Sequence, residues 1–487
     1  MIQPRINRKH GPTHSLPRAV LYRRALALLF IVVLAFSVRA LTANFLRARL
    51  DEPGWFPYGI YGAFDQQAQD WLDDRSSIFW IDDPSRTDKA NYAPGYPLWL
   101  ALIYKLSGSR SPEVVQNVQW VLDSFAVLLI AGAGVTAFGW RVGLWAGGIA
   151  ALWPLLAAYG AVPLADAPTS WIVVGAAWML LVAAKRKSFG WALGAGALIG
   201  VSCWLRANAI LLVFFWAIAI LLLVRAGWRR RAWLAASVLV AAMLVIAPII
   251  LRNAIVFHSF VPTGLGAGTN LLEGIGETER GAKEFGAPPN DRDVIEQEQV
   301  AFNVPPGAAF DLYYPDGIHD LYYPDGIQRD RARMSKAMTI IAQHPFWYAG
   351  SVVRRMVAVL KYAGEPNGIY GSAGINITSK KCLPPPWQGG TLAFFVNVLG
   401  MFQSVLRYLL LPLMIVGVFL AFRSDRRATA LIMATVFYYL VVGSLLHTHF
   451  RYGLPMQALL TIFGGVTLSS GQNGLRKVTD SRKDSPG

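Results

Sequence analysis

Charged residues and cysteine are both scarce in this sequence. Asp, Glu, Lys and Arg make up 15% of the 487 residues, whereas soluble domains carry about 25%. Hydrophobic residues reach 54% and the mean hydropathy is +0.39. The two cysteines, Cys203 in an apolar stretch and Cys382 in a loop, lack metal-ligand spacing and are not expected to pair. Because apolar stretches of about 20 residues recur along the chain, we expect an all-α polytopic membrane protein.

Signatures of several enzyme classes are also missing. The sequence has no Walker A, protein-kinase, serine-hydrolase or His-Glu-x-x-His pattern. The stretch Gly264–Gly268 lacks the G-x-G-x-x-G spacing and the βαβ context of a dinucleotide fingerprint, so we expect a loop there. The net charge of +16 does not indicate nucleic-acid binding, because the basic residues lie in short loops between apolar stretches. No cleavable signal peptide is predicted, since the apolar run behind the basic leader Met1–Arg24 has spanning length and no small-residue cleavage site.

The hydropathy pattern predicts ten membrane spans, and the basic residues predict their orientation. Basic clusters occupy the N-terminal segment, the tail and the loops after the second, fourth, sixth and eighth spans. Since such loops face the cytoplasm, both termini are predicted to be cytoplasmic. The spans are expected at residues 25–46, 112–138, 142–162, 167–184, 190–206, 208–224, 232–252, 391–421, 428–446 and 453–470.

The predicted spans divide the chain into four parts. A tandem repeat lies in the second of these parts, residues 253–390. Its copies are Asp311–Ile318 and Asp320–Ile327, and each carries a Pro-Asp-Gly turn signal. We interpret it as a local duplication in an exposed loop, with a paired binding element as the alternative. The four parts are an N-terminal membrane module with seven spans and an acidic first outer loop at 47–96 (1–252), a long outer-face region with an amphipathic helix (253–390), a three-span module (391–470) and a cytoplasmic tail (471–487).

Two short elements are predicted on the outer face. Residues Arg333–Tyr362 show the periodicity of one amphipathic interfacial helix. The stretch Tyr96–Leu106 is too short to span the bilayer, so we expect it to lie along the outer interface. Its Tyr96, Trp99 and Tyr104 would then be aromatic-belt residues.

The first outer loop carries nine acids between Arg47 and Tyr96. Most of these acids are expected to lie on a solvated surface, and one or two are expected to be catalytic. Asp65 is the leading candidate, because the apolar residues around it recur at helical spacing. At the start of such a helix, free backbone N–H groups would hold its carboxylate ionised, as a general base requires. A plain helix cap is the alternative role.

Asp166 and three arginines lie at predicted outer ends of spans. An acid as close to the hydrocarbon as Asp166 is costly and often functional, and a cap of the fourth span is an equal alternative. Arg206, Arg252 and Arg451 run against the positive-inside trend. Their guanidinium groups suit a phosphate through paired donors, and the alternative for each is snorkelling to lipid headgroups.

His447 and His449 are secondary candidates. An i,i+2 pair of histidines is a weak metal motif, and no third ligand is visible in the sequence. No cofactor is therefore predicted, and the use of a divalent metal stays open.

Several of these segments occur in the order seen in one superfamily. They are the acidic first loop, the stretch Pro94–Tyr104, Asp166, Leu251-Arg252-Asn253, His344-Pro345 and Arg451-Tyr452-x-x-Pro455. From about residue 20 to 470, the sequence resembles the GT-C membrane glycosyltransferases, in particular the protein mannosyltransferase and aminoarabinose transferase-like group (family 39 and relatives).

The resemblance implies a function and a site. It implies an inverting transfer from a sugar on undecaprenyl or dolichyl phosphate to a lipid, glycan or protein acceptor, at the outer face of a bacterial inner (plasma) membrane. It places the catalytic acid in the first outer loop, which Asp65 matches best, and a second acid at Asp166. Asp51 and Glu52 also resemble an acid pair, so the identity of the base stays open. The expected partners are the lipid-linked donor, the acceptor and membrane lipids, without nucleic acid.

A polytopic lipid or polysaccharide transporter or flippase is the alternative. Transporters place ionisable groups near the midplane on broken helices, often with internal repeats. Here the predicted spans are nearly free of charge at mid-depth, and one half of the chain does not repeat the other. A non-catalytic export subunit would not require the loop acids, so a transferase is the preferred interpretation.

Overall fold

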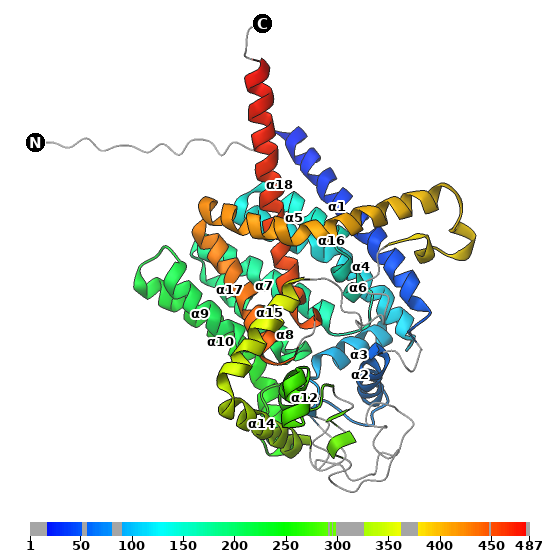
Figure 1. The fold of residues 1–487 in the computed structure, drawn as a ribbon, viewed down its shortest axis with the longest axis vertical. Coiled ribbons are helices and arrows are strands. Elements are labelled where there is room, and N and C mark those ends of the chain that lie inside the picture. The colour runs from blue at the N-terminus through cyan, green and yellow to red at the C-terminus, as the bar shows by residue number, and fades with distance from the viewer. Residues whose placement is uncertain are drawn as a thin grey trace, which may run out of the picture.

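The computed structural model describes residues 17–50, 56–79, 90–290, 293–294, 296–298, 326–361, 378–447 and 450–483. Within these ranges the chain forms helices and turns and no strand. Figure 1 shows the long helices packed as a bundle, with shorter helices gathered at one end.

Six helices are long and apolar enough to cross a bilayer, and one bent pair passes the same test together. The six are α1 (Arg18–Arg47), α4 (Pro112–Phe138), α7 (Asp166–Arg186), α10 (Trp228–Phe257), α16 (Gly390–Ser424) and α17 (Arg426–Leu445). The bent pair is α5 (Trp140–Leu152) and α6 (Pro154–Gly160), at 63°. The other helices of the bundle are α8 (Phe189–Leu205), α9 (Leu212–Leu223) and α18 (Leu454–Lys483).

Each predicted span coincides with one of these helices or with the bent pair, and the all-α polytopic fold is confirmed. The count of ten is not confirmed, because among the described residues only six helices, or seven spans with the bent pair, are long and apolar enough. The third predicted span is the one that bends. Pro154 begins α6 after an extended Trp153, and a proline disfavours helical backbone in the residue before it.

Glycines set the spacing of the bundle helices. A Cβ placed on Gly196 of α8 would lie 2.2 Å from the carbonyl oxygen of Val238 in α10. One placed on Gly417 of α16 would lie 1.9 Å from the carbonyl oxygen of Phe463 in α18. No side chain fits at such distances, so small residues let these backbones approach closely, as in other membrane bundles.

A buried ion pair lies inside the bundle, where the sequence predicted almost no charge. Nε of Arg39 in α1 lies 2.5 Å from Oδ2 of Asp123 in α4, and the two side chains are 2% and 7% exposed. The indole N–H of Trp171 donates to the other carboxylate oxygen, and Arg39 Nη1 donates to the carbonyl of Ala151 at 3.2 Å. Both charges are thus satisfied within the protein, which is the condition for burying them.

Six shorter helices form what we call the loop layer: α2 (Phe56–Leu72), α3 (Gly95–Ser107), α11 (Ala267–Gly276), α12 (Glu279–Phe285), α14 (Gly326–Gln343) and α15 (Pro345–Lys361). Helices α2 and α3 share one hydrophobic cluster, and the other four share a second. In Figure 1, α2, α3, α12 and α14 lie at the end of the molecule opposite the C-terminal end of α18.

The prediction of an aromatic belt on α3 was wrong for two of its three residues. Tyr96 and Tyr104 are 0% and 3% exposed, and Trp99 is half-buried. Phe64 of α2 packs against the ring of Tyr96, with 5.0 Å between centroids. The apolar face of α3 is therefore covered by α2, because two short amphipathic helices of one loop bury their faces against each other.

The single helix predicted over Arg333–Tyr362 is two helices. Helix α14 ends at Gln343 and α15 begins at Pro345, with His344 between them. Pro345 has no backbone N–H and disfavours helical backbone at the preceding residue, so the periodic pattern continues while the helix does not. Tyr362 and the tandem repeat lie outside the described residues, except for Gly326 and Ile327 at the start of α14.

Candidate active site

A cavity of about 620 Å³ lies where the bundle meets the loop layer. The starts of α7 and α11, the ends of α8 and α17, part of α14 and the short helix η7 (Phe450–Gly453) contribute to its wall. Its charged lining residues are Asp166, Arg206, Arg329, Asp330, Arg333 and Arg451. Pockets of this size hold small ligands, and the four arginines against two aspartates favour an anionic one.

Asp166 and Arg206, both predicted from the sequence, form an ion pair in this cavity. Asp166 is the first residue of α7, and its N-cap is Ala165, so it does not cap the helix through its side chain. Arg206 follows the last residue of α8 with an extended backbone. The side chain of Asp166 is 3% exposed, whereas that of Arg206 is 21% exposed and lies over the ring of Tyr452, 4.7 Å from its centroid. Arg206 is therefore the accessible member of the pair.

Tyr452 lies at the centre of a second group of contacts. Its hydroxyl accepts a hydrogen bond from Arg451 Nη2 at 3.2 Å and donates to Asn270 at 3.4 Å, and His447 Nε2 lies 3.2 Å from it. Burial opposes ionisation of the phenol, but Arg451, His447 and Arg206 outweigh it and lower the pKa of Tyr452. The phenol is thus a polarised hydrogen-bonding group in the cavity wall.

His447 connects this group to two acids. Its Nδ1 lies 3.6 Å from Glu273 and 3.6 Å from Glu277. Burial disfavours the imidazolium, but Tyr452 and Glu277 outweigh it, so the pKa of His447 is raised above its ordinary value of 6.5. Within the described residues no group of three His, Cys, Asp or Glu side chains could hold a metal ion. His449 lies outside the described residues.

Sequence analysis did not single out the contribution of α14. Asp330 accepts from the backbone N–H groups of Gly266 and Gly268, at 3.1 and 3.0 Å, and so holds the loop before α11. A Cβ on Gly268 would lie 2.2 Å from the Asp330 carbonyl oxygen, which explains a glycine there. Arg333 binds Glu298 through two nitrogens, at 2.6 Å each. The charge run Arg329-Asp330-Arg331-Ala332-Arg333 was the available signal.

The sequence predicted Asp65 at the start of a helix, but the structure does not place it there. It lies well inside α2, which begins at Phe56. Its carboxylate accepts from the Tyr104 hydroxyl at 2.5 Å and from Gln69 Nε2 at 2.8 Å. Burial raises the pKa of Asp65 above 3.8, although these hydrogen bonds lower it. Asp65 does not line the cavity, but its neighbour Phe64 does.

The structure does not bring Arg252 to the cavity. Its Nε donates to the Ile78 carbonyl at 2.8 Å, its Nη1 donates to Asn253 at 2.8 Å, and it is 3% exposed. These contacts tie the C-terminal part of α10 to the segment between α2 and α3. Asp51 and Glu52 lie outside the described residues, so the choice among Asp51, Glu52 and Asp65 as the base stays a prediction.

Comparisons with known proteins agree with the expected superfamily. The sequence model described as dolichyl-phosphate-mannose-protein mannosyltransferase matches residues 89–251. No curated protein matches the sequence.

Two solved structures of one oligosaccharyltransferase share this fold, and the match to a third structure is weaker. The oligosaccharyltransferase of Archaeoglobus fulgidus in its apo form has a TM-score of 0.52 at 13% identity, over 96% of this chain and 52% of that chain. Its complex with zinc and sulfate has a TM-score of 0.51 at 12% identity, over 92% and 49%. ArnT from Cupriavidus metallidurans bound to undecaprenyl phosphate has a TM-score of 0.33 at 13% identity, over 97% and 82%. The chain thus spans about half the length of the oligosaccharyltransferase chains.

The family match covers part of the chain, and the similarity in fold covers nearly all of it. About a third of the chain, residues 89–251, is similar to the dolichyl-phosphate-mannose-protein mannosyltransferase family, and the long apolar helices mark an integral membrane protein.

Proposed function

We propose that this chain is an inverting glycosyltransferase that moves a sugar from a polyprenyl-phosphate donor to an acceptor at the outer face of the membrane. The observation that carries the proposal is the cavity between bundle and loop layer, which holds a buried aspartate paired with the accessible guanidinium of Arg206 and lined by further arginines. The matching family is described by a dolichyl-phosphate sugar, which supports a lipid-linked donor.

The donor phosphate would bind to Arg206 and Arg451. Both line the cavity, and both contact Tyr452. Guanidinium groups bind phosphate oxygens through paired N–H donors. The polarised phenol of Tyr452 would add a hydrogen bond, and Asp166 would hold Arg206 in place. The charge of the departing phosphate would be neutralised where it develops, which is the electrostatic requirement of such a transfer.

The acceptor hydroxyl or amine would attack the anomeric carbon from the side opposite the phosphate. Its new bond to that carbon forms as the bond from the carbon to the phosphate oxygen breaks, and the electron pair leaves with the polyprenyl phosphate. The acceptor's proton passes to Asp65, whose raised pKa suits a general base. For Asp65 to take this proton, the acceptor must approach along α2, whose Phe64 lines the cavity.

The orientation in the membrane is part of the proposal. The loop layer would face outside and both termini would face the cytoplasm, because the basic loops lie at the opposite ends of the spans. Cysteine labelling in a background without Cys203 and Cys382 tests this orientation. Glu284→Cys should react with a membrane-impermeant reagent in intact cells, and Lys187→Cys should react only after permeabilisation. The reverse pattern would contradict the proposal.

The buried pair of Arg39 and Asp123 is the one observation that favours a transporter, because ionisable groups within spans often serve transport. Trp171 and Ala151 complete its hydrogen bonds, however. We therefore assign the pair to holding α1 against α4.

Turnover by the purified protein in detergent separates the two functions. The assay follows consumption of radiolabelled polyprenyl-phosphate sugars in the presence of membrane-extract acceptors. A transferase consumes one of these donors and releases polyprenyl phosphate. Movement of intact donor across vesicle membranes, without consumption, would support a flippase and contradict the proposed function.

A further inference from the structure

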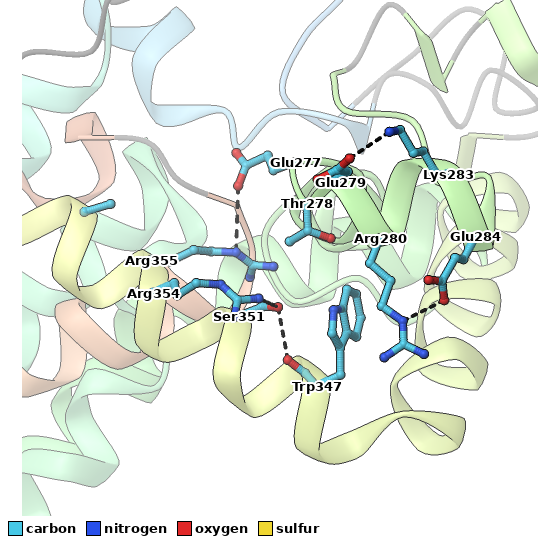
Figure 2. Close-up of a pocket in the computed structure, with 11 residues that line it drawn as sticks. Glu277, Thr278, Glu279, Arg280, Lys283, Glu284, Trp347, Ser351, Arg354 and Arg355 are labelled. Atoms are coloured by element: carbon cyan, nitrogen blue, oxygen red, sulfur yellow. Dashed lines mark hydrogen bonds and ion pairs between the residues drawn. The ribbon is translucent and has the colours of Figure 1, made fainter.

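A second cavity lies in the loop layer, outside the proposed donor site. It is a groove of about 750 Å³ between α12 and α15. Figure 2 shows the indole ring of Trp347 rising from α15 between Ser351 and Arg280, with Glu277 and Arg355 at the other end of the groove. The two helices thus present an aromatic ring and hydrogen-bonding groups to one space.

The charges in this groove nearly balance, with four cations against three glutamates. Each of its glutamates is paired with a cation, so neither sign dominates and a polyanion is not the ligand that the groove favours. Arg354, which is exposed, donates from Nη2 to Ser351 Oγ at 2.8 Å. The pairs are Arg280–Glu284 and Lys283–Glu279, at 2.7 Å each, and Arg355–Glu277, at 3.7 Å.

Trp347 provides an apolar face among these polar groups. It is half-buried, and Phe285 holds it from α12 in an edge-to-face contact with 5.1 Å between ring centroids. A sugar ring has an apolar C–H face and a rim of hydroxyls. An indole face bordered by guanidinium, carboxylate and hydroxyl groups can contact the C–H face and both donate to and accept from the rim.

The groove and the donor cavity share a wall. Glu277 lines the groove and lies 3.6 Å from His447, which lies 3.2 Å from the hydroxyl of the cavity-lining Tyr452. Arg355 Nη1 also donates to the carbonyl oxygen of Leu446, which lines the cavity, at 2.9 Å. A ligand in the groove would therefore lie across this wall of side chains from the donor cavity.

We propose that this groove binds the sugar portion of a glycan acceptor, an inference that rests on the proposed transferase function. Trp347 takes the C–H face of an acceptor sugar, and the exposed Arg354, held by the buried Ser351, binds its hydroxyls. Its volume falls within the range of pockets that hold small ligands. The acceptor class is accordingly a glycan rather than a peptide.

Saturation-transfer NMR on the purified full chain tests the groove directly. The probes are linear trisaccharides of mannose, glucose and galactose, each titrated separately. The wild type should bind at least one of them, and Trp347→Ala and Arg354→Ala should each raise its Kd about tenfold or more, as expected for losing a buried apolar contact or a charge-assisted hydrogen bond. Phe346→Ala is the matched control, because this neighbouring aromatic is 90% exposed and does not line the groove.

The outcomes separate this inference from the proposed function. Unchanged binding in both groove variants overturns it, and so does a wild type that binds no trisaccharide or that binds only a Ser/Thr-rich peptide. If Trp347→Ala does not fold, the exposed Arg354→Ala decides the result. Trisaccharide binding in the groove by a protein that consumes no lipid-linked donor would instead refute the transferase function and leave a glycan-binding groove.

Discussion

Replacing Asp65 by Asn tests the proposed base, because it removes the charge and keeps the size of the side chain. The amide oxygen can still accept the hydrogen bond that Tyr104 donates at 2.5 Å. Loss of a general base should lower transfer about 10²–10⁴-fold, which corresponds to roughly 3–5 kcal/mol in the activation barrier. The measurement is the rate of consumption of a radiolabelled polyprenyl-phosphate sugar by purified protein.

The same substitution should not lower stability. Burial raises the pKa of Asp65 above 3.8, so folding favours the protonated carboxyl over the ionised one. The contribution of such a group to stability is fully present below its unfolded pKa and is lost as the pH rises through its folded pKa. The ionised form of the Asp65 carboxylate therefore destabilises the folded state. Thermal unfolding at pH 7 should show Asp65→Asn to be as stable as the wild type or more so.

Asp70→Asn is the matched control, since Asp70 lies on the same helix and accepts a hydrogen bond from Gln66 at 2.8 Å. It should transfer at nearly the wild-type rate. Asp51→Asn, Glu52→Gln and Asp166→Asn complete the set. Normal transfer by Asp65→Asn together with an inactive Asp51 or Glu52 variant would assign the base to another acid of the first loop. Normal transfer by the Asp65, Asp51, Glu52 and Asp166 variants would refute the mechanism.

Three further predictions concern the cavity and the bundle. Arg451→Ala should weaken donor use about 10–100-fold, because one charge-assisted hydrogen bond is lost. Arg252→Ala should instead lower the melting temperature and leave the donor KM unchanged. Equal donor KM values in the two variants would contradict this division of roles. His447→Asn should destabilise the protein most below pH 6.5 and less as the pH rises through the raised pKa of His447, since the stabilisation by the imidazolium disappears once it deprotonates. Thermal unfolding of variant and wild type across pH 5–9 measures this loss of stability. A difference in stability that does not depend on pH would refute the prediction. Asp123→Asn should cost about 3–5 kcal/mol of stability by leaving the buried Arg39 without its carboxylate, and combining Arg39→Met with Asp123→Leu should recover most of the loss in denaturant unfolding; an additive double variant would show that the pair is not coupled.

The sequence alone predicted the all-α fold and the positions of the bundle helices, but not a confirmed number of spans. A helix that crosses a bilayer needs about 20 apolar residues whatever its neighbours are, so the predicted ranges coincide with helices of the structure. The same locality explains the identification of Asp166 and Arg206, because each interrupts an apolar stretch where a charge is costly. The resemblance to a superfamily followed from the order of such local features, and a family model matches residues 89–251.

Only the tertiary structure decided which of these side chains meet. Asp166 pairs with Arg206 across the ends of α7 and α8, and Arg39 pairs with Asp123 between α1 and α4. Neither pair has a signature in the sequence, since its members are separated by 40 and 84 residues. Helix packing also placed Asp65 inside α2 against Tyr104, not at a helix start.

The contribution of α14 and the groove between α12 and α15 have the same origin. Their residues come from a region that the sequence shows only as a periodic pattern with scattered charges, and a cavity is a property of the space between elements. Periodicity reports which face of a helix is apolar, but it does not report which other helix covers that face. That choice depends on how the whole chain excludes apolar surface from water and lipid, which is why the sequence indicated Asp166, Arg206 and Arg451 but not the other residues of the cavity.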